Sequence, residues 1–289
     1  MRIGCHGLVW TGSYDAAGIR EAVRRTKDVG FDLIEFPLMD PATFDTTAAR
    51  SALDQEGIVA TGSLGLSAAT DISGEEPEAV RAGEDLLNRA VDVLAALGSE
   101  HLCGIIYSAM RKYDTFATSR GVANSQDVIG RVARRAADAG ITVSLEVTNR
   151  YESNVLNTAR QARDFVAGIP GVEVGIQLDS YHMNIEETDM FLPILETGPQ
   201  LKYVPVGESH RGYLGTGSVD LNSLFRALQH ISFDGPVVFE SFSSAVASGQ
   251  LTRTLGIWRD LWDDGDELGR HALGFIQAQL SANQAATGY

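Results

Sequence analysis

Residues 137–146, ADAGITVSLE, join the end of a helical pattern, a glycine and a short apolar strand that finishes in an acid. The order of helix end, glycine and buried strand recurs in DVGFDLIEF (28–36), DQEGIVATG (54–62) and SFDGPVVFE (232–240). A glycine at this point suits a helix that ends in a left-handed residue. We expect this role for Gly30, Gly57, Gly98, Gly140, Gly171 and Gly235. Repeated units of helix, glycine and buried strand are typical of parallel β-α-β folds.

Eight strands can be placed along the chain: Ile3–Val9, Asp32–Phe36, Val59–Leu64, His101–Ile106, Thr142–Glu146, Val174–Leu178, Tyr203–Val206 and Val237–Glu240. Helices are predicted at Ala16–Val29, Thr46–Gln55, Glu78–Leu97, Val128–Ala139, Thr158–Ala167, Leu221–Ile231 and Thr252–Leu261, with a shorter one at Met190–Leu195. Eight alternating units favour an α/β fold, a single (β/α)8 TIM barrel domain over residues 1–289 with a short, frayed polar tail from Ser281. A Rossmann fold has no support, because no Gly-x-Gly-x-x-Gly follows the first strand.

Composition narrows the classes of function. The 289 residues are 44% hydrophobic, and 38 acids against 23 Lys and Arg give a net charge of −15. This charge argues against nucleic-acid binding and against docking to anionic membranes. No apolar run is long enough for a transmembrane helix, and the N-terminus lacks an apolar signal region. Cys5 and Cys103 form no Cys-x-x-Cys motif, which favours reduced thiols in a cytoplasmic protein.

Three of the predicted strands end in a carboxylate: Glu146, Asp179 and Glu240. Active sites of parallel barrels lie at the carboxyl ends of the strands, so these three acids are expected to converge at one mouth. One such acid alone would be read as a helix cap or a solvated charge. Three together repel one another unless a cation neutralises them. Hard oxygen ligands favour Mn²⁺, Mg²⁺ or Co²⁺ over a structural zinc.

More polar residues follow the same strand ends: Arg150, Glu152 and Asn154, then His182, Asn184, Glu186 and Glu187, then Glu208, His210 and Arg211. Glu186 and Glu187 are interpreted as helix-start charges. His182, three residues after Asp179, is either a substrate contact or a satisfied structural histidine. Arg211 is a long donor that could clamp a substrate hydroxyl or pair with an acid such as Glu152.

Five stretches carry a family resemblance: LEVTNRYESNVLNT, LDSYHMNIEE, GESHRGYLGTGSVD, GPVVFESF and IWRDL. In this order they resemble the ketose 3-epimerases, which comprise D-tagatose, D-allulose (D-psicose) and L-ribulose 3-epimerases among the xylose-isomerase-like TIM barrels. The similarity runs from IGCHGLVW near the N-terminus to IWRDL near residue 261. The resemblance implies an isomerase with one divalent metal, Mn²⁺ or Co²⁺ and less often Mg²⁺. It also implies a free ketohexose or ketopentose as substrate, and a homodimer or homotetramer.

The resemblance also implies roles for single residues. Glu146 and Glu240 match the metal-bound acid/base pair, and Asp179 matches the third carboxylate ligand. Glu152, His182 and Arg211 match substrate-binding residues. His6, Trp10, Gly104 and Phe242 fall where the family lines its sugar pocket.

One position departs from the family pattern. Similar enzymes have a metal-ligating histidine six residues before the arginine that matches Arg211, whereas this chain has Pro205 there. Proline offers no ligand and is unusual in a strand with no free edge. Three interpretations are open: a weaker site of three carboxylates and water, a substitute ligand from His210 or His182, or a variant of reduced activity. We expect weakened metal affinity, which the Pro205→His variant would restore.

The expected reaction is C3 epimerisation of a free ketose, as between D-fructose and D-allulose, D-tagatose and D-sorbose, or L-ribulose and L-xylulose. One glutamate removes the C3 proton and the other returns a proton on the opposite face. Three alternatives remain. The first is an aldose–ketose or hydroxypyruvate-type isomerase. The second is a DNA-repair endonuclease, which the charge and the six histidines disfavour. The third is a metal-impaired barrel that binds sugar with little turnover.

Overall fold

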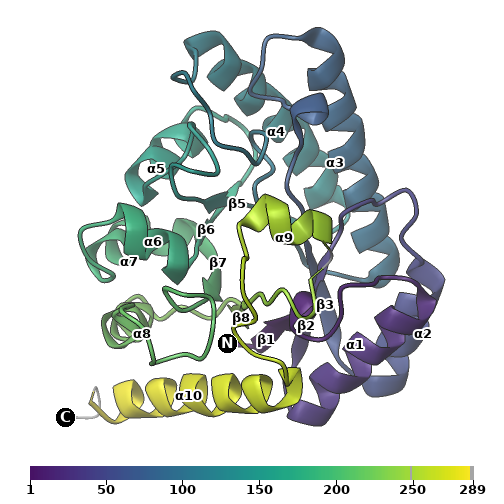
Figure 1. Ribbon diagram of the computed structural model, residues 1–289. Coiled ribbons are helices and arrows are strands. Elements are labelled where there is room, and N and C mark those ends of the chain that lie inside the picture. Colours follow the sequence, from purple (N-terminus) through teal and green to yellow (C-terminus); the bar gives the residue numbers. More distant parts are fainter. Residues whose placement is uncertain (248, 287–289) are drawn as a thin grey trace.

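The structure, a computed structural model, describes residues 1–247 and 249–286 and confirms the predicted fold class (Figure 1). Eight parallel strands close into a barrel in chain order, with β8 paired to β1. They are β1 (Ile3–His6), β2 (Leu33–Pro37), β3 (Val59–Ser63), β4 (His101–Cys103), β5 (Thr142–Val147), β6 (Gly175–Leu178), β7 (Leu201–Val206) and β8 (Val237–Phe239). A closed ring leaves no free strand edge, so all eight carboxyl ends meet at one mouth.

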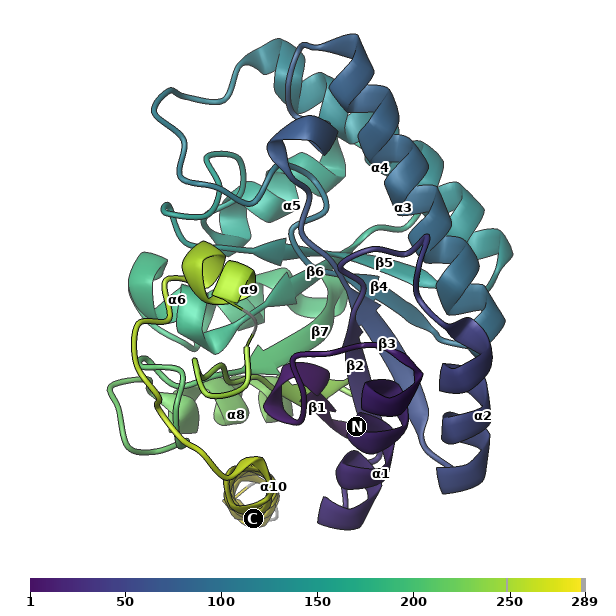
Figure 2. The same cartoon turned by 45° about the vertical axis from the view of Figure 1, so that its right-hand side comes forward.

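The helices mostly surround the strands on the outside of the barrel, whereas the short helix after β8 lies at its mouth (Figure 2). They are α1 (Ala16–Val29), α2 (Thr46–Glu56), α3 (Pro77–Leu97), α4 (Ser119–Asp138), α5 (Ala159–Ala167), α6 (Ser180–Glu186), α7 (Leu192–Thr197), α8 (Leu221–His230), α9 (Gly249–Leu255) and α10 (Gly265–Ala286). Their apolar stripes face the strands, as Ile19, Ala22 and Val23 of α1 do. Among the described residues, no helix has the length and apolar character needed to cross a membrane.

The inside of the barrel is filled by side chains, and part of this filling is polar. Tyr203 packs there with Leu33, Cys103 and Val238. Its hydroxyl donates a hydrogen bond to Glu35 Oε2 at 2.6 Å and lies 2.7 Å from Thr61 Oγ1. The barrel is therefore a packed core that supports a site at its mouth and is not an open channel.

Several predicted boundaries were wrong. Strand β1 stops at His6 and continues as a 3₁₀ turn over Gly7–Val9, and β4 stops at Cys103. Helix α4 begins nine residues before the predicted Val128. The helix expected at Thr252–Leu261 is α9, which ends at Leu255. Helix α6 and the last helix, α10, were not predicted.

The expected frayed tail from Ser281 was wrong for the part that is described. Helix α10 continues to Ala286, and residues 287–289 lie outside the described part. The glycines that interrupt its apolar pattern have a packing reason. A Cβ on Gly265 would lie 2.4 Å from the Val9 carbonyl oxygen, and one on Gly269 would lie 2.6 Å from the Trp10 ring. These glycines let α10 pack closely against the segment that follows β1.

The predicted helix-ending glycines have positive φ with one exception. Gly30, Gly57 and Gly98 are left-handed C-caps, and Gly140 and Gly171 also have positive φ. Gly235 does not, so that prediction was wrong. After α8 the left-handed residue is Ser232, with φ 53°. Its N–H donates to the Gln229 carbonyl at 3.0 Å, which completes the turn before β8.

Candidate active site at the barrel mouth

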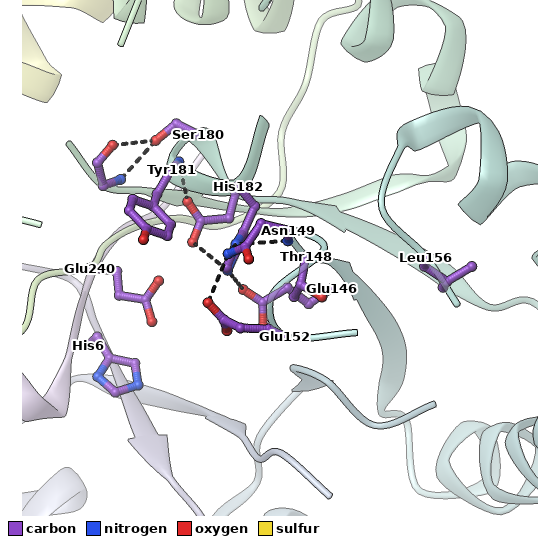
Figure 3. Close-up of polar contacts among 12 residues, drawn as sticks. His6, Glu146, Thr148, Asn149, Glu152, Leu156, Ser180, Tyr181, His182 and Glu240 are labelled. Carbon is purple, nitrogen blue, oxygen red and sulfur yellow. Dashed lines mark hydrogen bonds and ion pairs between the residues drawn. The ribbon is translucent and has the colours of Figure 1, made fainter. Parts of the chain in front are cut away.

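The three strand-end carboxylates converge at the mouth of the barrel: Glu146 and Glu240 face one space (Figure 3), and Asp179 lies close to Glu146 and shares the Arg211 guanidinium with Glu240. Glu146 is the penultimate residue of β5, and Glu240 directly follows β8. Asp179 directly follows β6, where its side chain caps α6 by accepting the Tyr181 N–H at 2.7 Å. That bond uses Oδ1 and leaves Oδ2 facing the site. Parallel strands of one barrel thus place acids far apart in sequence around a single space.

Burial and mutual repulsion make these carboxylates hard to ionise. Burial, followed by the charges of Glu240 and Asp179, raises the pKa of Glu146 well above its usual value. Burial also raises the pKa of Asp179 to about 6, although Arg211 opposes this change. The pKa of Glu240 is raised mainly by burial. A site that holds this much negative charge in a dry environment fits a bound cation.

Arg211 provides positive charge within the site. Its Nη1 lies 2.9 Å from Glu240 Oε2 and 3.3 Å from Asp179 Oδ2. Its guanidinium also stacks over the Tyr181 ring, with Cζ 3.7 Å from the ring centroid. Of the two roles left open for Arg211, pairing with an acid is therefore observed, although the acids are Glu240 and Asp179 and not the suggested example Glu152.

The segment 207–219 presents Arg211 to the site, and Glu208 organises this segment. The buried Glu208 carboxylate accepts N–H groups from Ser209, Gly215 and Val219 at 2.8, 3.0 and 3.1 Å. Arg211 itself has φ 62°, the left-handed region that non-glycine residues rarely adopt. Glu208 thus has a structural role, which its position after a strand end did not reveal.

His182 lies beside two of the carboxylates. Its Nε2 is 3.6 Å from Glu146 Oε1 and 3.9 Å from Asp179 Oδ2. One ligand atom each from Glu146, Asp179 and His182 all lie within 4.8 Å of one another, a spacing at which the three could hold a metal ion. Burial lowers the pKa of His182 to about 4, so the ring is neutral at pH 7.

Asn149 orients this histidine, and sequence reasoning missed it. Its backbone N–H donates to His182 Nδ1 at 3.2 Å. Its side-chain Oδ1 accepts the Tyr151 N–H at 2.9 Å, so its Nδ2 faces the site. There Nδ2 lies 2.8 Å from both His182 Nδ1 and Glu152 Oε1. The NRYES sequence could have indicated this, since Asn commonly hydrogen-bonds its own loop backbone.

Glu146 and Glu240 face a pocket whose walls come from many elements, and Asp179 is buried behind them. The lining residues are His6, Leu8, Pro37, Met39, Ser63, Leu64, Gly65, Gly104, Ile105, Met110, Glu146, Glu152, His182, Arg211, Glu240, Phe242, Leu251 and Leu255. His6, Gly104 and Phe242 are among these lining residues, and their contact with a sugar stays a prediction. Gly104 has φ 109°, and a Cβ there would lie 2.4 Å from the Leu64 carbonyl oxygen, so glycine is required.

Trp10 does not line this pocket, and that prediction was wrong. It packs against Phe31, with ring centroids 6.4 Å apart, and under α10. Besides Asn149, sequence reasoning missed three further residues. Leu251 and Leu255 come from α9, and Glu35 lies below the site with Oε1 3.5 Å from His6 Nε2. Glu35 had a signal, because DLIEF repeats the strand-then-acid order of VSLE.

Glu186 ends α6 and Glu187 is its C-cap, so neither acid lies in the first turn of the next helix, α7, as the interpretation as helix-start charges implied. Glu186 makes a two-pronged ion pair with Arg150, at 2.9 and 2.8 Å. Glu187 accepts the Ala159 N–H at 2.7 Å and so caps the neighbouring helix α5. Both acids hold the outer loops together and do not line the pocket.

Comparison with known proteins gives a consistent result. Residues 23–268 match the family described as xylose isomerase-like TIM barrel. A ketose 3-epimerase from Arthrobacter globiformis is 62% identical over 98% of each chain. An L-ribulose 3-epimerase from a Methylomonas strain is 46% identical over 96% of this chain and 97% of its own. A crystal structure of a Methylomonas D-allulose 3-epimerase in complex with D-allulose superposes with a TM-score of 0.95, at 46% identity, over 96% of this chain and 97% of that one.

The barrel, the convergent carboxylates and these similarities agree with the resemblance seen in the sequence motifs. The chain belongs to the xylose isomerase-like TIM barrel family and, within that family, to the ketose 3-epimerases.

Proposed function

We propose that this protein is a metal-dependent epimerase that inverts C3 of free ketoses. The observation that carries the proposal is the placement of Glu146 and Glu240 on different sides of one pocket (Figure 3). Inversion needs a base on one face of C3 and an acid on the other, and two carboxylates from β5 and β8 can meet this need. The 62% identical relative named ketose 3-epimerase supports the same reaction.

In this proposal Glu146 and Glu240 exchange roles with the direction of the reaction. The C2 carbonyl of a ketose acidifies the C3 proton, but water alone removes that proton too slowly. One carboxylate takes the proton to give an enediolate, and the other, protonated, returns a proton to the opposite face. The raised pKa values of both groups suit this, because each must hold a proton during half of the cycle.

The neighbouring side chains would bind and orient the sugar. His182 directs its Nε2 into the site, where it can donate to a sugar oxygen. Glu152 and Arg211 also line the pocket and can hold hydroxyl groups. His6 and Gly104 complete the wall close to the acids, with Gly104 allowing close approach to the backbone.

A divalent cation fits the donor set, since Glu146, Asp179 and Glu240 are buried acids in excess of the positive charge beside them. Mn²⁺ or Co²⁺ is proposed, with Mg²⁺ as a further candidate. The cation would supply positive charge that stabilises negative charge on substrate oxygens. The protein contributes the three carboxylates, the orientation of the sugar and the exclusion of water from the pocket.

The proposed substrates are free ketohexoses and ketopentoses, without nucleic-acid or membrane partners. A cytoplasmic location is proposed because Cys5 and Cys103 are free and buried. A homodimer or homotetramer is proposed, and exposed apolar residues such as Phe116 and Trp258, at 95% and 74% exposure, support self-association.

The test is product identification. The protein is stripped with chelator, supplied with Mn²⁺ or Co²⁺, and incubated separately with D-fructose, D-allulose and L-ribulose. Chromatography should show the C3 epimer of at least one ketose and no aldose. Accumulation of an aldose would indicate aldose–ketose isomerase activity instead. Absence of any product at saturating metal would contradict the proposal.

A further inference from the structure

Strand β7 offers no carboxylate or histidine to the mouth, whereas Asp179 follows its neighbour β6 and Glu240 follows its other neighbour β8. Tyr203 points into the barrel, where it contacts Glu35 and Thr61. Side chains alternate along a strand, so Pro205 occupies the next inward position towards the mouth. It pairs in register with Val238, two residues before Glu240. Pro205 therefore lies on the strand between the strands that carry Asp179 and Glu240, and its ring has no atom that can bind a cation.

His182 does not replace the missing ligand, because of its hydrogen bonds. The Asn149 backbone N–H can only donate, and it donates to His182 Nδ1 at 3.2 Å. A ring whose Nδ1 accepts a hydrogen bond carries its proton on Nε2. That N–H is the atom that faces Glu146 and Asp179, at 3.6 and 3.9 Å. A protonated nitrogen can donate to an oxygen but has no lone pair for a metal.

In the other two histidines near the mouth, His6 and His210, Nδ1 also accepts a hydrogen bond from a backbone N–H. His6 Nδ1 accepts the Leu8 N–H at 3.2 Å, which places its proton on Nε2. His210 Nδ1 accepts the Gly212 N–H at 3.0 Å, and its Nε2 lies 3.0 Å from Thr216 Oγ1, away from the pocket lining. None of these rings presents an unprotonated nitrogen to the carboxylates.

We propose that the cation in this chain is held by oxygen ligands alone, from Glu146, Asp179 and Glu240, with His182 as a hydrogen-bond donor beside them. This inference deepens the proposed function and rests on its metal site. An imidazole ligand favours Co²⁺ and later transition metals, whereas carboxylate and water suit Mg²⁺ and Mn²⁺. Loss of the nitrogen ligand should therefore lower the preference of this site for Co²⁺ over Mg²⁺.

The direct test uses pulsed electron paramagnetic resonance of the full-length protein loaded with Mn²⁺, which detects a nitrogen bound to the metal. The unmodified protein should show no coupling from a bound imidazole nitrogen, and His182→Gln should give the same spectrum. A coupling in the unmodified protein that disappears in His182→Gln would overturn the inference. This comparison needs no substitution at the crowded β7 position.

The second test measures dissociation constants of Mg²⁺, Mn²⁺ and Co²⁺ by calorimetry. Pro205→His should gain a nitrogen coupling and raise the affinity for Co²⁺ relative to Mg²⁺ by about tenfold or more. Pro205→Ala is the matched control, since it removes proline without adding a ligand, and it should match the unmodified protein. An unchanged Co²⁺ to Mg²⁺ ratio in a folded Pro205→His variant would contradict the inference.

Failure of the inferred metal site and failure of the proposed epimerase activity can be told apart, because they are read by different measurements. If Mn²⁺ keeps the spectrum of the free hydrated ion in the presence of excess protein, the metal site is refuted. Formation of a C3 epimer is measured separately on the sugars, so epimerase activity could still stand.

Discussion

Arg211 Nη1 lies 2.9 Å from Glu240 Oε2, so a guanidinium directly contacts one of the two proposed acid/base groups. The same nitrogen reaches Asp179 at 3.3 Å, and the Tyr181 ring covers the guanidinium plane. This contact lowers the pKa of Glu240, against the larger effect of burial that raises it. Arg211 thus lines the pocket, and its charge lowers the pKa values of the neighbouring Asp179 and Glu240 against the effect of burial.

Arg211→Lys should lower kcat/KM by about 100-fold or more, because an ammonium group cannot reproduce the planar guanidinium contacts to two acids and a ring. Steady-state kinetics on the best ketose measures this. Arg150→Lys is a matched control, since Arg150 forms an exposed pair with Glu186 outside the pocket. Equal losses in both variants would refute a specific role for Arg211.

Glu146→Gln and Glu240→Gln should each lower kcat for epimerisation by roughly 10³-fold or more, since each removes one of two groups that transfer protons at C3. Circular dichroism and thermal melting should show folded proteins. Glu100→Gln, an exposed acid paired with Arg2, provides the control and should retain full activity. Substantial turnover by either site variant would exclude a two-base mechanism.

The metal-free protein should be stabilised by Glu146→Gln at pH 8. The folded-state pKa of Glu146 lies well above its unfolded value, so holding the charge costs stability at any pH above the folded pKa. We therefore expect the variant to have the higher free energy of unfolding of the two proteins at this pH.

This advantage should shrink as the pH falls through the folded pKa, because the native glutamate then takes up its proton. Asp179, with a pKa of about 6, contributes in the same direction. Urea unfolding of both proteins between pH 5 and pH 8 measures the difference. An advantage that grows as the pH falls would contradict the assigned direction.

Asn149→Ala should release His182 from its fixed orientation. The variant keeps the backbone N–H bond to Nδ1 but loses the side-chain contacts to His182 and Glu152. We expect kcat/KM to fall by about 10-fold or more because the ring is less firmly oriented, while the imidazole ¹⁵N shifts keep the Nε2–H pattern that the backbone N–H maintains. Unmodified protein should show the Nε2–H form alone. Unaltered kinetics in the variant would show that the Asn149 side chain does not position the ring.

Tyr203→Phe should destabilise the protein while leaving the chemistry in place. It removes the hydroxyl that lies between Glu35 and Thr61 inside the barrel, and leaves a buried carboxylate with one partner fewer. We expect a loss of about 1–3 kcal/mol in the free energy of unfolding. Thermal and urea unfolding measure this loss. If the fall in kcat, expressed as a free energy of activation, exceeds the loss in the free energy of unfolding, Tyr203 would instead belong to the catalytic machinery.

The barrel and its acids were predictable because both depend on local patterns. The strand-then-acid order places Glu146, Asp179 and Glu240 at strand ends, and closure of a parallel barrel then brings them together. The same order at Glu35 was overlooked, although it puts a fourth acid just below the mouth.

Other features depend on contacts between distant segments, which local patterns do not encode. Glycines in α10 weaken its helical pattern, yet they are required where the helix packs on Val9 and Trp10. Arg211 pairs with Asp179 and Glu240 only because the segment held by Glu208 folds over the mouth. The tautomer of His182 is set by Asn149, 33 residues earlier in the chain.

The measurement that tests the central claim most directly is hydrogen exchange at C3. The metal-loaded protein is incubated with D-fructose, D-allulose and L-ribulose in D₂O, and NMR reads the deuterium at each carbon. The account predicts deuterium at C3 together with accumulation of the C3 epimer. Deuterium at C1 without exchange at C3, or no exchange at any carbon at saturating metal, would contradict it.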